Sequence, residues 1–167
     1  MKTLLLMRHA KSSWNHPELA DHDRPLNKRG KRDAPAMGEY VAEQELVPDL
    51  VISSTAVRAR KTAEKVARAF GEKIEPVLFP ELYHAEPPNY ESVLCGLSDQ
   101  YSRVLLVSHN PGIEEILALL AGVDEAVPTA TVAWIELPIE SWGQFSVDVQ
   151  GELITVWKPH ELFEDVD

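Results

Sequence analysis

Residues 4–15 read Leu4-Leu5-Leu6-Met7-Arg8-His9-Ala10-Lys11-Ser12-Ser13-Trp14-Asn15, a short apolar run that ends at an arginine and a histidine. An apolar run of this length, closed by polar residues, is typical of a strand buried on both faces of a sheet. In open α/β folds, ligands bind at the carboxyl ends of such strands. The sequence therefore predicts that Arg8 and His9 lie where chemistry takes place.

Composition indicates a globular protein with a single domain, residues 1–167. The chain has 167 residues, 44% of them hydrophobic, and no apolar stretch approaches the roughly 20 residues that span a bilayer. The N-terminus lacks the pattern of a secretory signal. The single cysteine, Cys95, excludes an internal disulfide and a zinc site built from several cysteines. We expect a cytoplasmic protein, with Cys95 buried in a helix.

The formal net charge is −11. A strongly acidic protein repels nucleic acid and anionic membranes at long range, so we expect neither as a partner. An anionic ligand would therefore need a local concentration of positive charge, which makes the placement of the arginines informative.

Apolar periodicity predicts alternating strands and helices. Strands are expected at 3–7, 50–53, 75–79 and 104–108, and helices at 31–45, 57–70, 89–98 and 113–121. Further β segments are expected at 131–137, 145–149 and 153–157, with a tight turn at Gln150-Gly151. Pro35 lies inside the first helix and obscures where that helix begins. The pattern predicts an α/β three-layer sandwich, a mostly parallel central sheet flanked by helices, with antiparallel strands added near the C-terminus.

Three predicted strand ends are followed by charged or imidazole side chains. Arg8 and His9 follow the first strand, Arg58 lies beyond the second strand, and His109 follows the fourth strand. Arg24 lies on the connection between the first and second strands. Guanidinium groups match phosphate oxygens in bidentate geometry, and a neutral imidazole is a competent nucleophile toward phosphorus. These residues together predict a pocket for a phosphoryl group.

Four segments resemble motifs of the histidine phosphatase superfamily, also called the phosphoglycerate-mutase-like family. Residues 8–15 are similar to R-H-G-E-[ST]-x-W-N, and residues 25–30 to P-L-T-x-x-G. Residues 53–63 are similar to S-S-x-x-x-R-A-x-x-T-A, and Ser108-His109 to the second-histidine motif. Ala10 and Lys11 depart from the family's Gly and Glu. The four motifs occur in the family's order, which makes the combination far more specific than any one of them.

Within the superfamily, the chain is most similar to phosphohistidine phosphatases of the SixA type. Those proteins are short, carry the Arg-Pro-Leu form of the second motif, here Arg24-Pro25-Leu26, and lack a large cap over the site. The resemblance implies a phosphohydrolase that needs no metal or other cofactor. It would act on protein phosphohistidine or on a small phosphorylated substrate.

The resemblance also implies a role for each site residue. His9 is the nucleophile, with its other ring nitrogen held by an acceptor such as a backbone carbonyl. Arg8, Arg58 and His109 stabilise the phosphoryl oxygens. Arg24, Ser12 and Asn15 are further candidates to bind phosphate, although Arg24 could also serve only to fix its loop.

Glu81 is the candidate general acid. An alkoxide leaving group needs such a proton, whereas an imidazole leaving group needs it much less, since its conjugate acid has a pKa of about 6.5. The neighbouring histidine, His84, is a weaker candidate. The segment Asp21-His22-Asp23 could suggest metal ligands, but nothing completes a site and we expect a surface loop.

Three functions remain open at this point. The preferred one is a phosphohistidine phosphatase. The second is a small-molecule phosphomonoester phosphatase or a phosphosugar mutase of the same superfamily. A mutase is disfavoured because the region between the third and fourth strands leaves room for one short helix and no cap. The third is a phosphate-binding module without catalysis, which would not require a nucleophilic histidine.

Overall fold

The computed structural model, which describes residues 1–163, contains a six-stranded sheet in the order β3-β2-β4-β1-β5-β6. The apolar run at the N-terminus forms β1 (Lys2–Arg8), which pairs in parallel with β4 (Arg103–Ser108). The short strands β2 (Leu50–Ser53) and β3 (Val77–Leu78) extend the parallel part. Two antiparallel strands, β5 (Val132–Leu137) and β6 (Glu152–Trp157), complete the other side. The predicted α/β sandwich, with antiparallel strands near the C-terminus, is confirmed.

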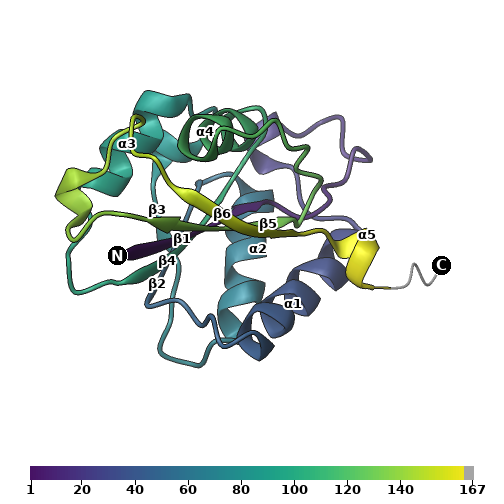
Figure 1. Ribbon diagram of the computed structural model, residues 1–167. Helices are drawn as coiled ribbons and strands as arrows, with labels where there is room; N and C mark the ends of the chain where they lie inside the picture. Colours follow the sequence, from purple (N-terminus) through teal and green to yellow (C-terminus); the bar gives the residue numbers. More distant parts are fainter. Residues whose placement is uncertain (164–167) are drawn as a thin grey trace.

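Helices cover both faces of the sheet, which Figure 1 shows nearly edge-on. The helices α1 (Lys28–Glu43) and α2 (Val57–Arg68) pack on one face. On the other face lie α3 (Pro87–Cys95) and α4 (Gly112–Ala121), and the short α5 (Pro159–Leu162) follows β6. Side chains of β1 alternate between the two resulting cores: Leu4 and Leu6 enter one, Leu5 and Met7 the other. This double burial explains the unbroken apolar run.

Two helices begin two or three residues earlier than predicted. α1 starts at Lys28 because the side chain of Asn27 accepts a hydrogen bond from the Gly30 N–H and caps the helix, and Pro35 lies inside it. α3 starts at Pro87, where a missing N–H costs nothing, and it ends before Gly96. Cys95, on its last turn, is exposed rather than buried, so that expectation is wrong.

The predicted strand at 145–149 is wrong. These residues follow a 3-10 turn, Trp142–Gln144, and form no ladder. Their alternating apolar side chains, Phe145, Val147 and Val149, instead pack against the core from an irregular segment. The Val147 N–H donates to the side chain of Glu91. Consequently Gln150-Gly151 does not close a hairpin, and β6 pairs with β5.

Among the described residues, no helix combines the length and apolar character needed to cross a membrane.

Candidate active site

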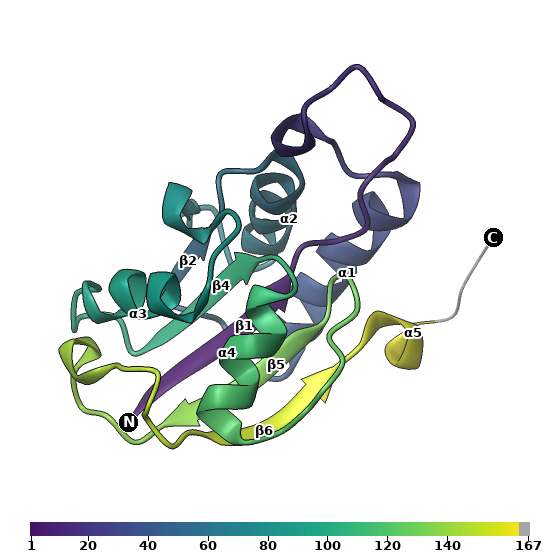
Figure 2. The ribbon, with the colours of Figure 1, turned by 90° about the horizontal axis from the view of Figure 1, so that it is seen from above.

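The parallel strands bring the motif residues to one edge of the sheet. Arg8 is in register with Ser108, and Ser53 with Val107, so the chain leaves β1, β2 and β4 at the same level. The next residue after β1, His9, donates its N–H to the Ser108 carbonyl at 3.0 Å. In Figure 2 the ends of β1, β2 and β4 point toward the start of α2 and the long loop after β1.

A pocket of about 250 Å³ opens at this edge. Five of the six predicted phosphate ligands line it, together with the predicted nucleophile. Its lining residues are Arg8, His9, Lys11, Ser12, Trp14, Arg24, Arg58, His109, Asn110 and Thr129. No carboxylate is among the described residues that line the pocket, so its electrostatic character is cationic.

His9 is held as a neutral imidazole with one free nitrogen. Its Nδ1 lies 2.8 Å from the carbonyl oxygen of Ala10. Because a carbonyl only accepts, Nδ1 carries the proton and Nε2 keeps its lone pair. Burial, helped by three nearby guanidinium groups and opposed by the bond to Ala10, lowers the pKa of His9 to about 3. The imidazole is therefore uncharged near neutral pH and has the form a nucleophile requires.

The second histidine, His109, faces the first at 5.0 Å between ring centroids. Its Nε2 lies 2.8 Å from Ser54 Oγ, and that hydroxyl also accepts the Ala56 N–H. Because a hydroxyl can donate one hydrogen bond and accept two, this contact is compatible with a proton on either Nε2 or Nδ1 of His109. Within residues 1–163, this Nδ1 has no hydrogen-bond partner. Burial, then repulsion by the ring of His9 once it is protonated and by Arg58, lowers the pKa of His109 to about 2.

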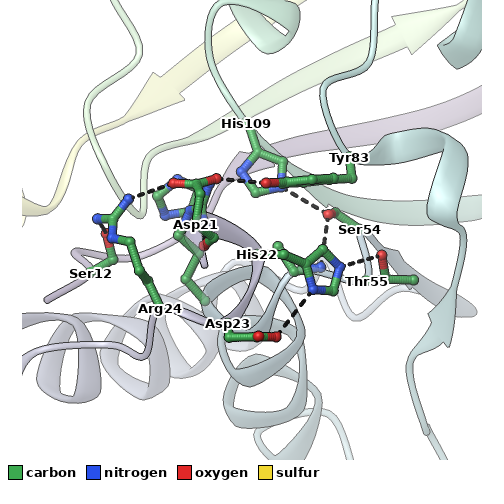
Figure 3. A network of polar contacts seen from close by, with 12 residues as sticks. Ser12, Asp21, His22, Asp23, Arg24, Ser54, Thr55, Tyr83 and His109 are labelled. Atoms are coloured by element: carbon green, nitrogen blue, oxygen red, sulfur yellow. Dashed lines mark hydrogen bonds and ion pairs between the residues drawn. The ribbon is translucent and has the colours of Figure 1, made fainter. Parts of the chain in front are cut away.

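The acidic residue Asp21, which the sequence assigns to a surface loop, bridges two arginines of the pocket. Figure 3 shows Asp21 beside Arg24 and Tyr83. Its carboxylate accepts from Arg24 at 2.9 Å and from Arg58 at 3.0 Å, and its backbone oxygen accepts from Arg58 at 2.7 Å. Tyr83 donates its hydroxyl to the same carboxylate at 2.7 Å. Hydrogen bonds from Tyr83 and then from the two guanidinium groups keep the pKa of Asp21 well below its usual range. The carboxylate is thus ionised and fixes both guanidinium groups.

Arg24 is also fixed from its other side. It donates to Ser12 Oγ and to the Ser13 carbonyl, and its guanidinium stacks on the ring of Trp14 at 3.4 Å. Trp14 as a whole residue is 73% exposed. An exposed tryptophan on a pocket-lining arginine was not predicted, because the motif alone does not say which way the loop turns.

Arg8 contributes a cation with an unused donor. One of its Nη atoms donates to the Val127 carbonyl at 3.2 Å, while Nε is buried without a partner among the described residues. Burial lowers the pKa of Arg8, and the carboxylate of Glu114 opposes this shift. A guanidinium nevertheless stays protonated in proteins. An anion in the pocket would face this positive charge.

One buried threonine ties the two halves of the site together. Thr62 Oγ1 accepts the Ala10 N–H at 2.9 Å and donates to the Arg58 carbonyl at 2.7 Å. Thr62 therefore sets the position of the loop after His9 relative to the first turn of α2. Its place in the third motif is the sequence signal for this contact, but the spacing does not reveal the partner.

Two predicted site residues lie outside the pocket. Asn15 is exposed and lines a neighbouring hollow instead. Glu81 is exposed on the 3-10 turn Pro80–Leu82 and is not among the described lining residues. Their predicted roles in phosphate binding and acid catalysis stay predictions that the geometry does not support.

The segment Asp21-His22-Asp23 forms a 3-10 turn whose polar groups are already engaged. His22 contacts Thr55 at 2.9 Å and Asp23 at 3.5 Å, as Figure 3 shows. Among the described residues, no group of three or more His, Cys, Asp or Glu side chains is arranged to hold a metal ion.

Comparisons with known proteins match this fold and these motifs. The family model of the histidine phosphatase superfamily, branch 1, matches residues 4–86. A candidate phosphohistidine phosphatase SixA from Agrobacterium tumefaciens superposes with a TM-score of 0.80 at 31% identity, covering 95% of this chain and 98% of that one. An uncharacterized protein of Mycobacterium leprae is 34% identical over 81% of this chain and 94% of its own length. A 2,3-bisphosphoglycerate-dependent phosphoglycerate mutase of Clavibacter michiganensis is 33% identical over 46% of this chain and 31% of the mutase.

Proposed function

Because this chain belongs to the histidine phosphatase superfamily, we propose that it hydrolyses protein phosphohistidine, with His9 as the nucleophile. The observation that supports this substrate is the absence of a carboxylic acid from the described lining of the pocket. An enzyme of this superfamily without a general acid cannot protonate the leaving group. It is therefore suited to a leaving group that does not need a proton from the protein.

In the first step, His9 Nε2 attacks phosphorus and the bond from phosphorus to the leaving nitrogen breaks. The Nδ1–H of His9 stays protonated and donates a hydrogen bond to the Ala10 carbonyl, which stabilises the positive charge that develops on the ring. Arg8, Arg58 and His109 donate to the three equatorial oxygens as charge spreads over them. The cationic pocket serves the same purpose, because it stabilises the transferring group throughout.

The leaving group decides how much acid catalysis the first step needs. When its distal nitrogen has taken a proton from water, a phosphorylated imidazole leaves as neutral imidazole. An alkyl ester would leave as a strongly basic alkoxide, for which the pocket offers no carboxylic acid. Asp21 cannot serve, because its carboxyl is held ionised by Tyr83, Arg24 and Arg58. The geometry thus favours phosphohistidine over alkyl phosphates.

In the second step, water attacks the phosphorus of phospho-His9. The bond from phosphorus to Nε2 breaks, inorganic phosphate leaves, and His9 returns to its neutral form. The segment between β3 and β4 holds the turn Pro80–Leu82 and α3, and this short connection supplies no larger element that could cap the pocket. An open site favours hydrolysis over the phosphoryl retention that a mutase requires.

A leaving-group series tests this proposal. We expect a phosphohistidine peptide and p-nitrophenyl phosphate to be hydrolysed, and an alkyl phosphate to react at least about 100-fold more slowly, the size of a missing acid catalyst. His9→Asn should abolish all activity, whereas the matched control His160→Asn, on α5, should leave it unchanged. Equal rates on the alkyl phosphate would contradict the proposal and favour a small-molecule phosphatase.

A further inference from the structure

A basic hollow of about 550 Å³ lies beside the catalytic pocket. Its charged part consists of Lys28, Arg29 and Lys31 from the start of α1, and Asn15 and His16 complete the wall toward the pocket. We refer to these five residues as the basic hollow. All of its cations are exposed.

The basic hollow and the pocket share one loop. The Asn27 N–H donates to the Lys11 carbonyl at 3.0 Å, and the Ser13 N–H donates to the Pro25 carbonyl at 2.8 Å. A Cβ placed on Gly30 would lie 2.1 Å from the Lys11 oxygen, so the first turn of α1 touches the loop directly. Lys11 also lines the pocket. A molecule whose phosphoryl group enters the pocket therefore passes close to the hollow.

The basic side chains of the hollow lie where the dipole of helix α1 disfavours positive charge. A helix N-terminus favours negative charge, yet the first turn of α1 contains no acidic residue. Arg29 pairs with Asp33 at 3.5 Å, whereas Lys28 and Lys31 form no ion pair with any described residue. The chain carries 27 acidic against 16 basic side chains. A predominantly acidic protein thus exposes uncompensated lysines at a position where they destabilise the helix.

We propose that the basic hollow binds an acidic surface of the phosphorylated protein substrate. This inference rests on the proposed function and adds the kind of partner. Complementary charge raises the rate of encounter and orients the partner, and the effect weakens with salt. The rest of the acidic chain would repel such a partner, so recognition would be confined to this side of the pocket.

The test compares two phosphohistidine peptides of equal length, one with glutamate residues around the phosphohistidine and one with glutamines. We expect the wild type to prefer the acidic peptide by about tenfold in kcat/KM at low salt. In the double variant Lys28→Glu/Lys31→Glu, this preference should disappear. Hydrolysis of p-nitrophenyl phosphate should stay unchanged, and the melting temperature should not fall, because glutamates suit a helix N-terminus.

A matched control makes the same change of charge away from the pocket and the basic hollow. Lys65→Glu/Lys73→Glu alters the end of α2 and the segment after it, and neither residue lines the pocket or the hollow. This variant should keep the preference for the acidic peptide. A wild type without that preference, or an equal loss in both double variants, would overturn the inference. If neither peptide is hydrolysed, the proposed function itself fails.

Discussion

Mild acid should destabilise this protein through the two histidines of its pocket. The folded-state pKa values of His9 and His109 lie at about 3 and about 2, below the ordinary value of 6.5, mainly because both rings are buried. The unfolded chain therefore binds more protons than the folded one as the pH falls through 6.5. The stability that the two neutral rings contribute is fully present above that pH. It is lost progressively toward the folded-state pKa values.

The magnitude follows from the size of the shift. At about pH 5.5, one unit below the unfolded value, each histidine should cost about 1.4 kcal/mol of folding free energy, and the pair about 2.8 kcal/mol. Asp21 does not contribute to the change in stability between these pH values. Its pKa is also lowered on folding, but the stability it contributes is lost only below its ordinary value of 3.8.

Urea unfolding at about pH 7.5 and about pH 5.5 measures the effect. For each variant we compare the unfolding free energy at the two pH values. Because both values come from the same variant, any effect of the substitution on stability that does not depend on pH cancels. The loss should be smaller by about 1.4 kcal/mol in His9→Asn and in His109→Asn, and unchanged in the control His160→Asn. If both variants lose as much stability as the wild type, the two rings are not held neutral by burial and the reasoning is refuted.

Three other substitutions test the construction of the site. Gly30→Ala should lower the free energy of unfolding by about 1–3 kcal/mol, because its Cβ would overlap the Lys11 carbonyl, and chemical denaturation measures this. Asp21→Asn should strengthen inhibition by inorganic phosphate several-fold, because it removes a negative charge that faces the pocket arginines, worth about 1 kcal/mol; a weaker phosphate inhibition would show that Asp21 mainly positions them. Thr62→Val should leave the Ala10 N–H unpaired and cost about 1–3 kcal/mol of stability; undiminished stability and kcat would contradict the linking role given to this hydroxyl.

Much of the fold and the pocket could be predicted from local patterns. The unbroken apolar run predicted a buried β1, and parallel strands necessarily bring their carboxyl ends together, which is how His9 meets Arg58 and His109. What failed was a segment with strand-like alternation, residues 145–149, because alternation reports only which side chains face a core. The hydrogen bonds of a backbone cannot be derived from that pattern.

The loops were the least predictable part of the site. Asp21 lies on the surface as expected, but its ion pairs with two pocket arginines were not predicted, because its sequence neighbours do not reveal what the loop folds against. Glu81 was a candidate acid from its motif-like position, yet the turn that carries it leaves its side chain exposed. The contacts of Asp21 join segments that lie more than 35 positions apart. The position of Glu81 depends on the geometry of a local turn. Spacing along the chain predicts neither.

The most direct test is to trap the phosphoenzyme. The protein would be mixed with a phosphohistidine peptide, quenched in alkali at early times, digested and analysed by mass spectrometry. The account predicts a phosphoryl group on His9, formed in the wild type and in His160→Asn and absent from His9→Asn. Turnover without a phosphorylated His9, or a phosphoryl group trapped on another residue, would contradict it.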